Sequence, residues 1–118
     1  MIGIDLIKVE RMKGSIERFG EKFLLRFLSP EEIILIKNHK TAAGFWAAKE
    51  ACSKALGCGI GKECSFHDIK LTKTAKGAPV ITLAHELLKS YSISDMSVSI
   101  THDGDYAMAV VAIEKTKV

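Results

Sequence analysis

The segment Phe45-Trp-Ala-Ala-Lys-Glu-Ala-Cys-Ser-Lys-Ala-Leu-Gly57 predicts the helix around which the rest of the chain folds. Ala, Leu, Lys and Glu are strong helix formers, and Gly57 suits the left-handed residue just past a helix end. The helical period offers one apolar side to a core: Phe45, Ala48, Cys52 and Leu56. The other side carries an aromatic ring, a hydroxyl group and two charges: Trp46, Ser53, Glu50 and Lys54. The commonest explanation of Glu50 and Lys54, four residues apart, is a solvated pair.

Composition indicates an ordinary globular protein. The chain has 118 residues, of which 47% are hydrophobic and 26% charged, and its net charge is +3. This length predicts one domain, residues 1–118, with a single core. The mild positive charge fits a protein that handles phosphates or meets an acidic partner, and scattered surface lysines explain it nearly as well. A small RNA-binding protein is disfavoured, because no aromatic residues alternate with basic ones on a strand.

The three cysteines predict neither a zinc site nor a redox motif. Cys52, Cys58 and Cys64 are six residues apart, and no signal peptide is visible, so we expect free thiols in a reducing compartment. The longest apolar run, residues 107–113, is too short to cross a bilayer. We therefore expect a soluble, cytoplasmic protein that does not enter the membrane.

An aspartate interrupts the first predicted strand. Residues 2–7 form a short apolar run that predicts a buried strand, with Gly3, Asp5 and Ile7 on one face. A carboxylate in such a strand must be paired, hydrogen-bonded or bound to a metal. Gly3 leaves room on the same face for something to approach closely. The alternative, that Asp5 ends the strand and caps the next helix, remains open.

Three helical pieces are predicted before the central helix. Residues 8–19 carry apolar side chains at helical spacing: Val9, Met12, Ile16 and Phe19. The other faces of this helix are rich in cations, which would suit an acidic partner helix, although a solvated face is commoner. A short piece follows at 21–28, and Ser29-Pro-Glu-Glu32 predicts a capping box. Thr41 is the predicted cap of the central helix.

Two hairpins are predicted in the second half of the chain. Residues 66–74 and 80–83 form the first, around Lys76-Gly-Ala-Pro79, and a short helix is expected over 84–91. Residues 96–102 and 106–113 form the second, with Asp103-Gly104-Asp105 as its turn. His102 is expected near the tip, where loop residues often carry function.

Three features of the sequence are best explained together: Asp5, Glu50, and a glycine loop that is followed by a lysine. The loop is Cys58-Gly-Ile-Gly61-Lys62, which fits neither a dinucleotide-binding nor a Walker A motif. Two carboxylates flanked by cations suit a magnesium ion that bridges phosphate oxygens, because magnesium takes one or two protein carboxylates and leaves its other positions to water and phosphate. From the residues alone, the prediction stops at a magnesium–phosphate site.

Four motifs, in this order and at this spacing, resemble those of the holo-acyl-carrier-protein synthase family, the short bacterial 4'-phosphopantetheinyl transferases. They are Gly3-Ile-Asp5, residues 46–57 with Gly59-Ile-Gly61, Lys76-Gly-Ala-Pro79, and Ser97-Val-Ser-Ile-Thr-His-Asp103. The resemblance covers essentially the whole chain. It implies an α+β fold, with a small antiparallel sheet packed against a long central helix. It also implies magnesium-dependent transfer of 4'-phosphopantetheine from coenzyme A to a serine of apo acyl carrier protein, which releases adenosine 3',5'-bisphosphate.

The resemblance also implies roles for particular residues. Asp5 and Glu50 match the family's magnesium ligands, and Glu50 or a metal-bound water would take the serine proton. Lys54 is expected beside the pyrophosphate, so Glu50 and Lys54 are the expected catalytic residues. Coenzyme A would contact the following residues: Lys54, Gly57, Gly59, Gly61, Lys62, Gly77, Pro79 and, at the nucleotide end, His102. Carrier-protein docking would fall to Arg11, Met12, Arg18 and Arg26. A homotrimer with sites at subunit interfaces is expected.

An alternative function is a non-catalytic module that binds coenzyme A or the carrier protein. Both proposed metal ligands, Asp5 and Glu50, are present, whereas a dead copy would be expected to have lost one. The transferase is therefore favoured.

Overall fold

The computed structural model describes residues 1–116. In chain order, its elements are β1 (Ile2–Lys8), α1 (Val9–Phe19), α2 (Glu21–Phe27), α3 (Pro30–Ile33), α4 (His39–Leu56), the 3-10 helix η1 (Phe66–Asp68), β2 (Ile69–Lys73), β3 (Pro79–Leu83), α5 (His85–Ser90), β4 (Ile93–Asp103) and β5 (Tyr106–Lys115). The predicted α+β class and its antiparallel strands are confirmed.

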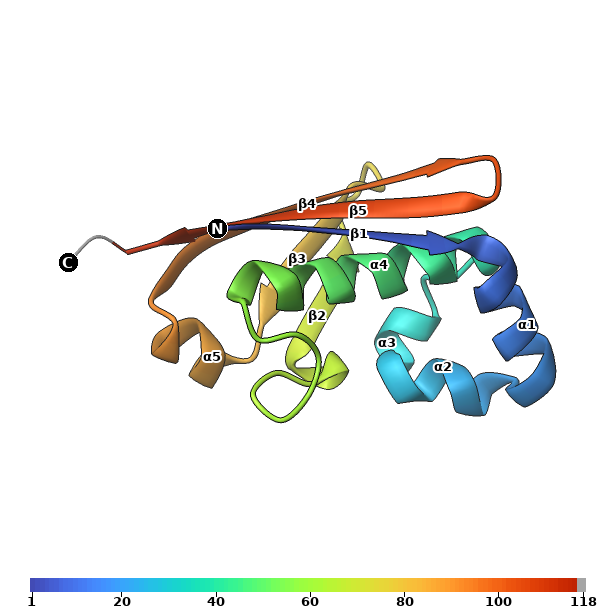
Figure 1. The fold of residues 1–118 in the computed structure, drawn as a ribbon, viewed down its shortest axis with the longest axis horizontal. Helices are drawn as coiled ribbons and strands as arrows, with labels where there is room; N and C mark the ends of the chain where they lie inside the picture. Colours follow the sequence, from blue (N-terminus) through green and yellow to red (C-terminus); the bar gives the residue numbers. More distant parts are fainter. Residues whose placement is uncertain (117–118) are drawn as a thin grey trace.

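The strands form two antiparallel sheets. The larger has the order β1-β5-β4, and the smaller pairs β2 with β3. Figure 1 shows α4 lying along one face of the larger sheet, with β2 and β3 beside it and α1 to α3 grouped at one end. Strand β5 pairs with the N-terminal strand in register from Ile2 opposite Ala112 to Lys8 opposite Tyr106. The first and last strands of the chain therefore lie side by side over the central helix.

A glycine sets the distance between β1 and α4. A Cβ atom on Gly3 would lie 2.0 Å from the carbonyl oxygen of Ala51 and 2.6 Å from the amide nitrogen of Ala55. No other residue type fits there without movement of the backbone. The close approach expected at Gly3 is thus made by a helix of the same chain, and it brings Asp5, two residues along β1, over the second half of α4.

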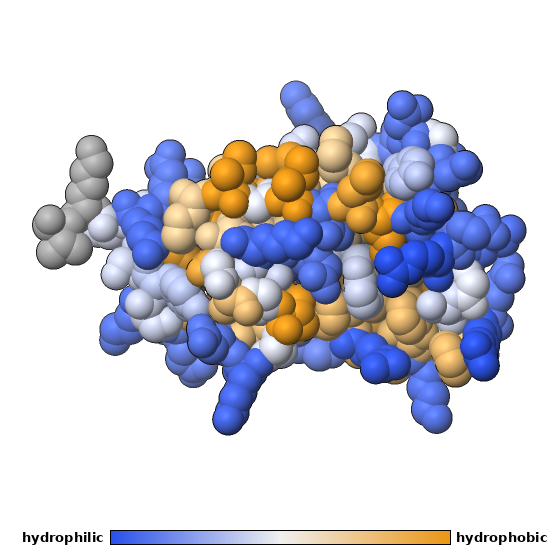
Figure 2. All heavy atoms as spheres, viewed as in Figure 1, coloured by the Kyte–Doolittle hydropathy of each residue, from blue (hydrophilic) through white to orange (hydrophobic). Residues whose placement is uncertain are grey.

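The outer face of β1 is not buried, although the sequence predicts a buried strand. Ile2, Ile4 and Leu6 are 72%, 54% and 58% exposed, while Ile7 points to the core. Figure 2 shows apolar side chains gathered along this upper part of the molecule. The alternation of faces follows the prediction, but within residues 1–116 no element covers the outer face. A row of exposed β-branched and aliphatic side chains on a strand usually marks an interface.

The predicted N-terminal cap is confirmed for α3 but not for α4. Ser29 and Glu32 form the capping box: Ser29 Oγ accepts from the Glu32 amide at 3.2 Å, and Glu32 Oε1 accepts from the Ser29 amide at 2.8 Å. The cap predicted at Thr41 is wrong. Asn38 caps α4 instead, accepting from the Thr41 amide at 3.1 Å. An asparagine side chain is a better cap than a threonine, and it gains an earlier turn of helix.

Two further expectations are revised. The predicted strand over 66–74 begins only at Ile69, because Ser65 and Asp68 cap a short 3-10 helix over Phe66–Asp68. Phe19, predicted to face inward, is 55% exposed. It lies in the last turn of α1 and at the edge of the apolar stripe, since ten residues on from Val9 is about 80° short of a whole number of turns.

Cys52, Cys58 and Cys64 are free thiols, as expected. Burial raises the pKa of Cys52 to about 12 and that of Cys64 to about 11, so neither is a ready nucleophile at neutral pH. Within residues 1–116, no helix combines the length and the apolar character needed to span a membrane.

Candidate active site

Asp5 and Lys54 meet where β1 crosses the last turns of α4. The Lys54 Nζ atom lies 2.9 Å from Asp5 Oδ1 and donates a second hydrogen bond to the Ile4 carbonyl oxygen at 3.2 Å. The Asp5 side chain is 14% exposed and that of Lys54 is 52% exposed. Asp5 therefore does not cap α1, whose N-cap is Lys8. Lys54 pairs with a residue of another element, and not in the solvated pair with Glu50 that the i,i+4 spacing suggests.

Glu50 lies beside this ion pair. It is half-buried, and burial raises its pKa above the usual value of 4.5. The negative charge of Asp5 raises that pKa further, whereas the positive charge of Lys54 lowers it. Two carboxylates and one ammonium group thus meet on the face formed by β1 and α4. Sequence reasoning predicted these residues, and the structure brings all three together.

This carboxylate pair fits a magnesium ion. Magnesium prefers hard oxygen ligands and commonly uses only one or two carboxylates of a protein. Asp5 and Glu50 repel one another, so a cation between them would relieve that repulsion as Lys54 now does in part. No group of three or more His, Cys, Asp or Glu side chains placed to hold a metal occurs in residues 1–116. The remaining positions of such an ion would therefore fall to water and a phosphate ligand.

The predicted glycine loop follows directly from the end of α4. Gly57 adopts φ 84°, and its amide donates to the Lys54 carbonyl oxygen at 3.0 Å, which ends the helix. Gly59 also has a positive φ of 68°, and the Gly61 amide donates to the Cys64 carbonyl oxygen at 2.9 Å. Lys62 is exposed within this loop. The loop thus begins three residues after Lys54, at the same end of α4 as Asp5 and Glu50.

His102 lies at the opposite end of α4. Its Nε2 atom is 2.9 Å from the Lys40 carbonyl oxygen, and because a carbonyl can only accept, Nε2 carries the hydrogen. Gly44 permits this contact, since a Cβ there would lie 3.2 Å from His102 Nε2 and 2.8 Å from Ile100 Cγ2. Lys54 lies 10 residues after Gly44 and 14 after Lys40, which is about 15–21 Å along the helix. One chain therefore does not bring His102 next to the Lys54–Asp5 pair.

A cavity of about 180 Å³ adjoins His102. Its lining comes from α4, the β2–β3 hairpin and β4: Thr41, Phe45, Lys73, Gly77, Pro79, Ile100 and His102. Gly77, Pro79 and His102, predicted together, therefore share one cavity. Sequence reasoning missed Lys73, whose Nζ lies 5.9 Å from the centre of the Phe45 ring. A usable signal existed, because Lys73 lies near the end of the predicted strand over 66–74, and a hairpin places that end opposite Pro79.

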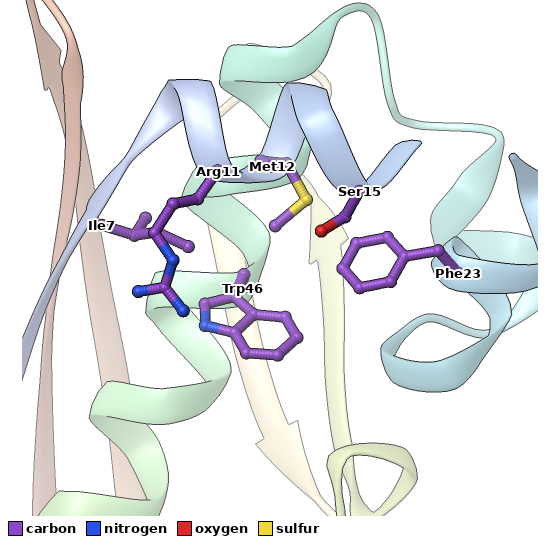
Figure 3. A pocket seen from close by; sticks show the side chains of 6 residues that line it. All are labelled: Ile7, Arg11, Met12, Ser15, Phe23 and Trp46. Atoms are coloured by element: carbon purple, nitrogen blue, oxygen red, sulfur yellow. The ribbon is translucent and has the colours of Figure 1, made fainter. Parts of the chain in front are cut away.

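A second cavity, of about 120 Å³, lies between α1, α2 and α4. Figure 3 shows Arg11 reaching across its mouth toward Trp46, with Met12, Ser15 and Phe23 forming the other walls. Met12 is 2% exposed, so this docking candidate contributes only to the cavity wall. Trp46 lies one turn before Glu50 on α4. The cavity and the carboxylates therefore follow one another along the same side of the helix.

The other two docking candidates lie farther along α1 and α2. The Arg18 guanidinium lies 5.3 Å from the centre of the Phe19 ring. Arg26 lines a hollow of about 270 Å³ together with Phe19, Lys22 and Phe23. All four docking candidates thus belong to the α1–α2 corner, where cationic side chains surround apolar rings.

Comparisons with known proteins agree over the whole chain. The family described as the 4'-phosphopantetheinyl transferase superfamily matches residues 1–111. A holo-[acyl-carrier-protein] synthase of Sulfurimonas denitrificans is 62% identical, with 98% of this chain and 96% of that protein covered. The crystal structure of the Helicobacter pylori holo-[acyl-carrier-protein] synthase in complex with coenzyme A has a TM-score of 0.94 at 51% identity, covering 97% of this chain and all of that one. The structure of the Bacillus anthracis synthase in complex with coenzyme A (3',5'-ADP) has a TM-score of 0.82 at 34% identity, and the match covers 98% of this chain and 96% of that one.

Proposed function

This chain belongs to the 4'-phosphopantetheinyl transferase superfamily, and we propose that it is a holo-acyl-carrier-protein synthase acting as one domain over residues 1–118. It transfers 4'-phosphopantetheine from coenzyme A to a serine hydroxyl of apo acyl carrier protein. The serine oxygen forms a bond to the β-phosphorus, the bond to the bridging pyrophosphate oxygen breaks, and adenosine 3',5'-bisphosphate leaves. The observation that carries this proposal is the meeting of Asp5, Glu50 and Lys54 in a chain with full-length relatives of that activity.

Asp5 and Glu50 are the proposed magnesium ligands. When bound, the ion would stabilise negative charge on the leaving bisphosphate. Phosphoryl transfer depends mainly on positioning and on charge stabilisation. Lys54 supplies a flexible point charge beside the pyrophosphate, and its 52% exposed side chain is free to turn from Asp5 toward a phosphate. Glu50 is proposed to accept the serine proton.

We propose a homotrimer, as the family resemblance implies, and two observations support an assembly with sites at subunit interfaces. The pyrophosphate of coenzyme A and its adenosine 3'-phosphate are joined through one ribose, which cannot span the roughly 15–21 Å of α4 between Lys54 and the residues that His102 contacts. Two chains must therefore combine if both residues contact the same molecule. The exposed face of Ile2, Ile4 and Leu6 offers an apolar surface for such an assembly.

Coenzyme A would contact both ends of α4 in this arrangement. Lys54 and the glycine loop (Gly57, Gly59, Gly61 and Lys62) of one chain would hold the pyrophosphate. Gly77, Pro79 and His102 of a neighbouring chain would hold the nucleotide end. Lys73, which shares their cavity, joins them as a further cation.

The carrier protein is proposed to dock on the α1–α2 corner. Arg11, Arg18 and Arg26 provide positive charge around exposed and half-buried rings, and an acidic helix is the complementary partner. Trp46, which lines the cavity together with Arg11 and Met12, lies one turn before Glu50 on α4. A docked carrier protein would thus present its serine near the carboxylates.

Mass spectrometry of apo acyl carrier protein tests the activity. The carrier protein is incubated with this protein, coenzyme A and magnesium, with and without a chelator. The expected result is a gain of one phosphopantetheine mass that the chelator prevents. Coenzyme A binding without any mass gain would favour the alternative, a non-catalytic module.

We place the protein in the cytoplasm, because its three free thiols suit a reducing compartment.

A further inference from the structure

A charged pair is buried in the core next to the proposed site. Lys49 is 0% exposed and Glu32 is 4% exposed, and they pair at 2.8 Å between Nζ and Oε1. Lys49 Nζ also donates to the carbonyl oxygens of Phe27 at 2.8 Å and Phe66 at 3.0 Å. An ammonium group has three hydrogens, so all its donors are used.

Glu32 is equally satisfied. Its Oε1 atom accepts from Lys49 and from the Ser29 amide at 2.8 Å, and its Oε2 atom accepts from the Leu71 amide at 2.8 Å. The pair therefore ties together the end of α2, the start of α3, the middle of α4, η1 and β2. Hydrogen bonds of this kind, unlike apolar contacts, are lost when one element turns or slides against another.

This network sets the rotation of α4. Lys49 directly precedes Glu50, and successive residues of a helix point about 100° apart. With Lys49 held on one side by three acceptors, Glu50 leaves the helix about 100° away, on the side where it feels the charge of Asp5. A small roll of α4 would break the contacts of Lys49 and turn both Glu50 and Lys54 away from β1.

The same network fixes the ring of Trp46. The Phe27 and Phe66 carbonyl oxygens are bound to Lys49, and their rings pack on Trp46 with centroids 5.1 and 4.8 Å apart. Phe27 and Phe66 also pack on each other at 6.0 Å. Trp46 forms a wall of the cavity beside Arg11 and Met12 (Figure 3). The buried Lys49 ammonium group thus holds the backbone of the two phenylalanines that support Trp46.

Stability alone does not explain a buried ion pair, because apolar replacements of similar volume are often as stable or more so. We propose that Lys49 and Glu32 are positioning residues, which hold Glu50 and Trp46 in the orientation needed for the transfer reaction. This inference rests on the proposed function. Neither residue contacts the substrates, so their effect should reach the reaction through Glu50 and Trp46.

The test is the double variant Lys49→Met/Glu32→Gln, which removes both charges and leaves no uncompensated ion. We expect it to fold, with a kcat about ten- to a hundredfold below that of the wild type. The KM for coenzyme A should change less than kcat, because of the proposed coenzyme-binding groups only Lys54 shifts with α4, while the glycine loop, Gly77, Pro79 and His102 are retained. Trp46 is the only tryptophan in the chain, so its fluorescence reports the cavity directly, and quenching by iodide should increase.

The matched control is Glu31→Gln/Lys70→Met, the same chemical change at exposed neighbours, and it should match the wild type in all three readouts. If the folded double variant kept wild-type kcat and quenching, the pair would be a stability element only, and the proposal would be wrong. If this double variant does not fold, Lys49→Gln/Glu32→Gln is used, which also leaves no uncompensated ion, and unchanged kcat and quenching there would also overturn the proposal. A wild type without transferase activity would instead contradict the proposed function, while the quenching comparison would still test the positioning of Trp46.

Discussion

Gly3 touches the backbone of Ala51 so closely that a methyl group on Gly3 would lie 2.0 Å from the Ala51 carbonyl oxygen. This contact joins the strand that carries Asp5 to the helix that carries Glu50 and Lys54. The distance between the two proposed metal ligands therefore depends on the absence of one side chain.

Gly3→Ala is expected to lower the free energy of unfolding by about 1–3 kcal/mol, because β1 must move away from α4. The same movement should separate Asp5 from Glu50 and lower turnover at temperatures where the variant is folded. Urea unfolding and initial rates at low temperature measure both effects. The control is Gly14→Ala, in α1, where a Cβ has no neighbour within 4 Å. That variant should gain about 0.5–1 kcal/mol, and an equal gain for Gly3→Ala would contradict the packing argument.

Asp5→Ala and Glu50→Ala should each abolish magnesium-dependent transfer and leave the fold intact. The Asp5–Lys54 pair is partly exposed, so losing it should cost less than about 1 kcal/mol of stability. Activity assays with titrated magnesium, alongside thermal unfolding, check the two parts separately. Wild-type turnover in either variant would remove that residue from the site.

Glu50→Gln should stabilise the protein at pH 7 in the presence of a chelator. The pKa of Glu50 is raised above 4.5, chiefly by burial and then by the charge of Asp5, so the folded state binds this proton more tightly than the unfolded state. Stability contributed by Glu50 is thus present at low pH and is lost as the pH rises from 4.5 through the folded value. The melting temperature of the variant should exceed that of the wild type at pH 7, and the difference should shrink at pH 4. If the difference in melting temperature were larger at pH 4 than at pH 7, the pKa of Glu50 would be lowered in the folded state and not raised.

The parts of this fold that depend on neighbouring residues were predictable from the sequence. The capping box of Ser29 and Glu32, the alternating faces of β1 and both hairpins follow from local rules and are present. The partner of Lys54 was not predictable, since the i,i+4 rule offers Glu50, while Asp5 lies 49 residues away in sequence.

The Lys49–Glu32 pair escaped the sequence argument for a similar reason. A lysine in a helix looks like a solvated residue, and only the packing of η1 and α2 against α4 shows that it is 0% exposed. Candidate residues were predicted by type and motif, but their grouping at the two ends of α4 required the fold. Local sequence patterns do not show which helix and strand ends lie next to one another in the fold.

Arg11→Glu/Arg18→Glu should raise the KM for the carrier protein by about tenfold or more and leave coenzyme A binding unchanged, because a like charge then faces an acidic partner. The wild-type rate should also fall with rising salt, and the variant should lose that dependence. Steady-state kinetics at two ionic strengths measures both. Lys70→Glu/Lys89→Glu, at exposed positions on other elements, provides the charge-matched control. An unchanged KM in the arginine variant would move docking away from α1.

Ile4→Glu should dissociate the assembly, because it places a charge at the centre of the exposed β1 face. Sedimentation of the wild type should give a trimer, and that of the variant a monomer with lowered activity. Lys115→Glu, at the end of β5, introduces a carboxylate outside that face and controls for charge. A monomeric wild type with full activity would contradict both the assembly and the shared site.

Mixing two defective chains tests the shared site directly. Glu50→Ala and His102→Ala should each be nearly inactive alone, since each lacks one part of every site. If a site takes Glu50 from one chain and His102 from its neighbour, trimers assembled from both variants contain some sites with both residues intact. Random assembly of equal amounts should restore about a quarter of the wild-type activity. This follows from the position of His102 against the Lys40 carbonyl oxygen, at the far end of α4 from Lys54. Co-expressed, differently tagged chains that recover no activity would show that Glu50 and His102 act within one chain and would contradict the shared site.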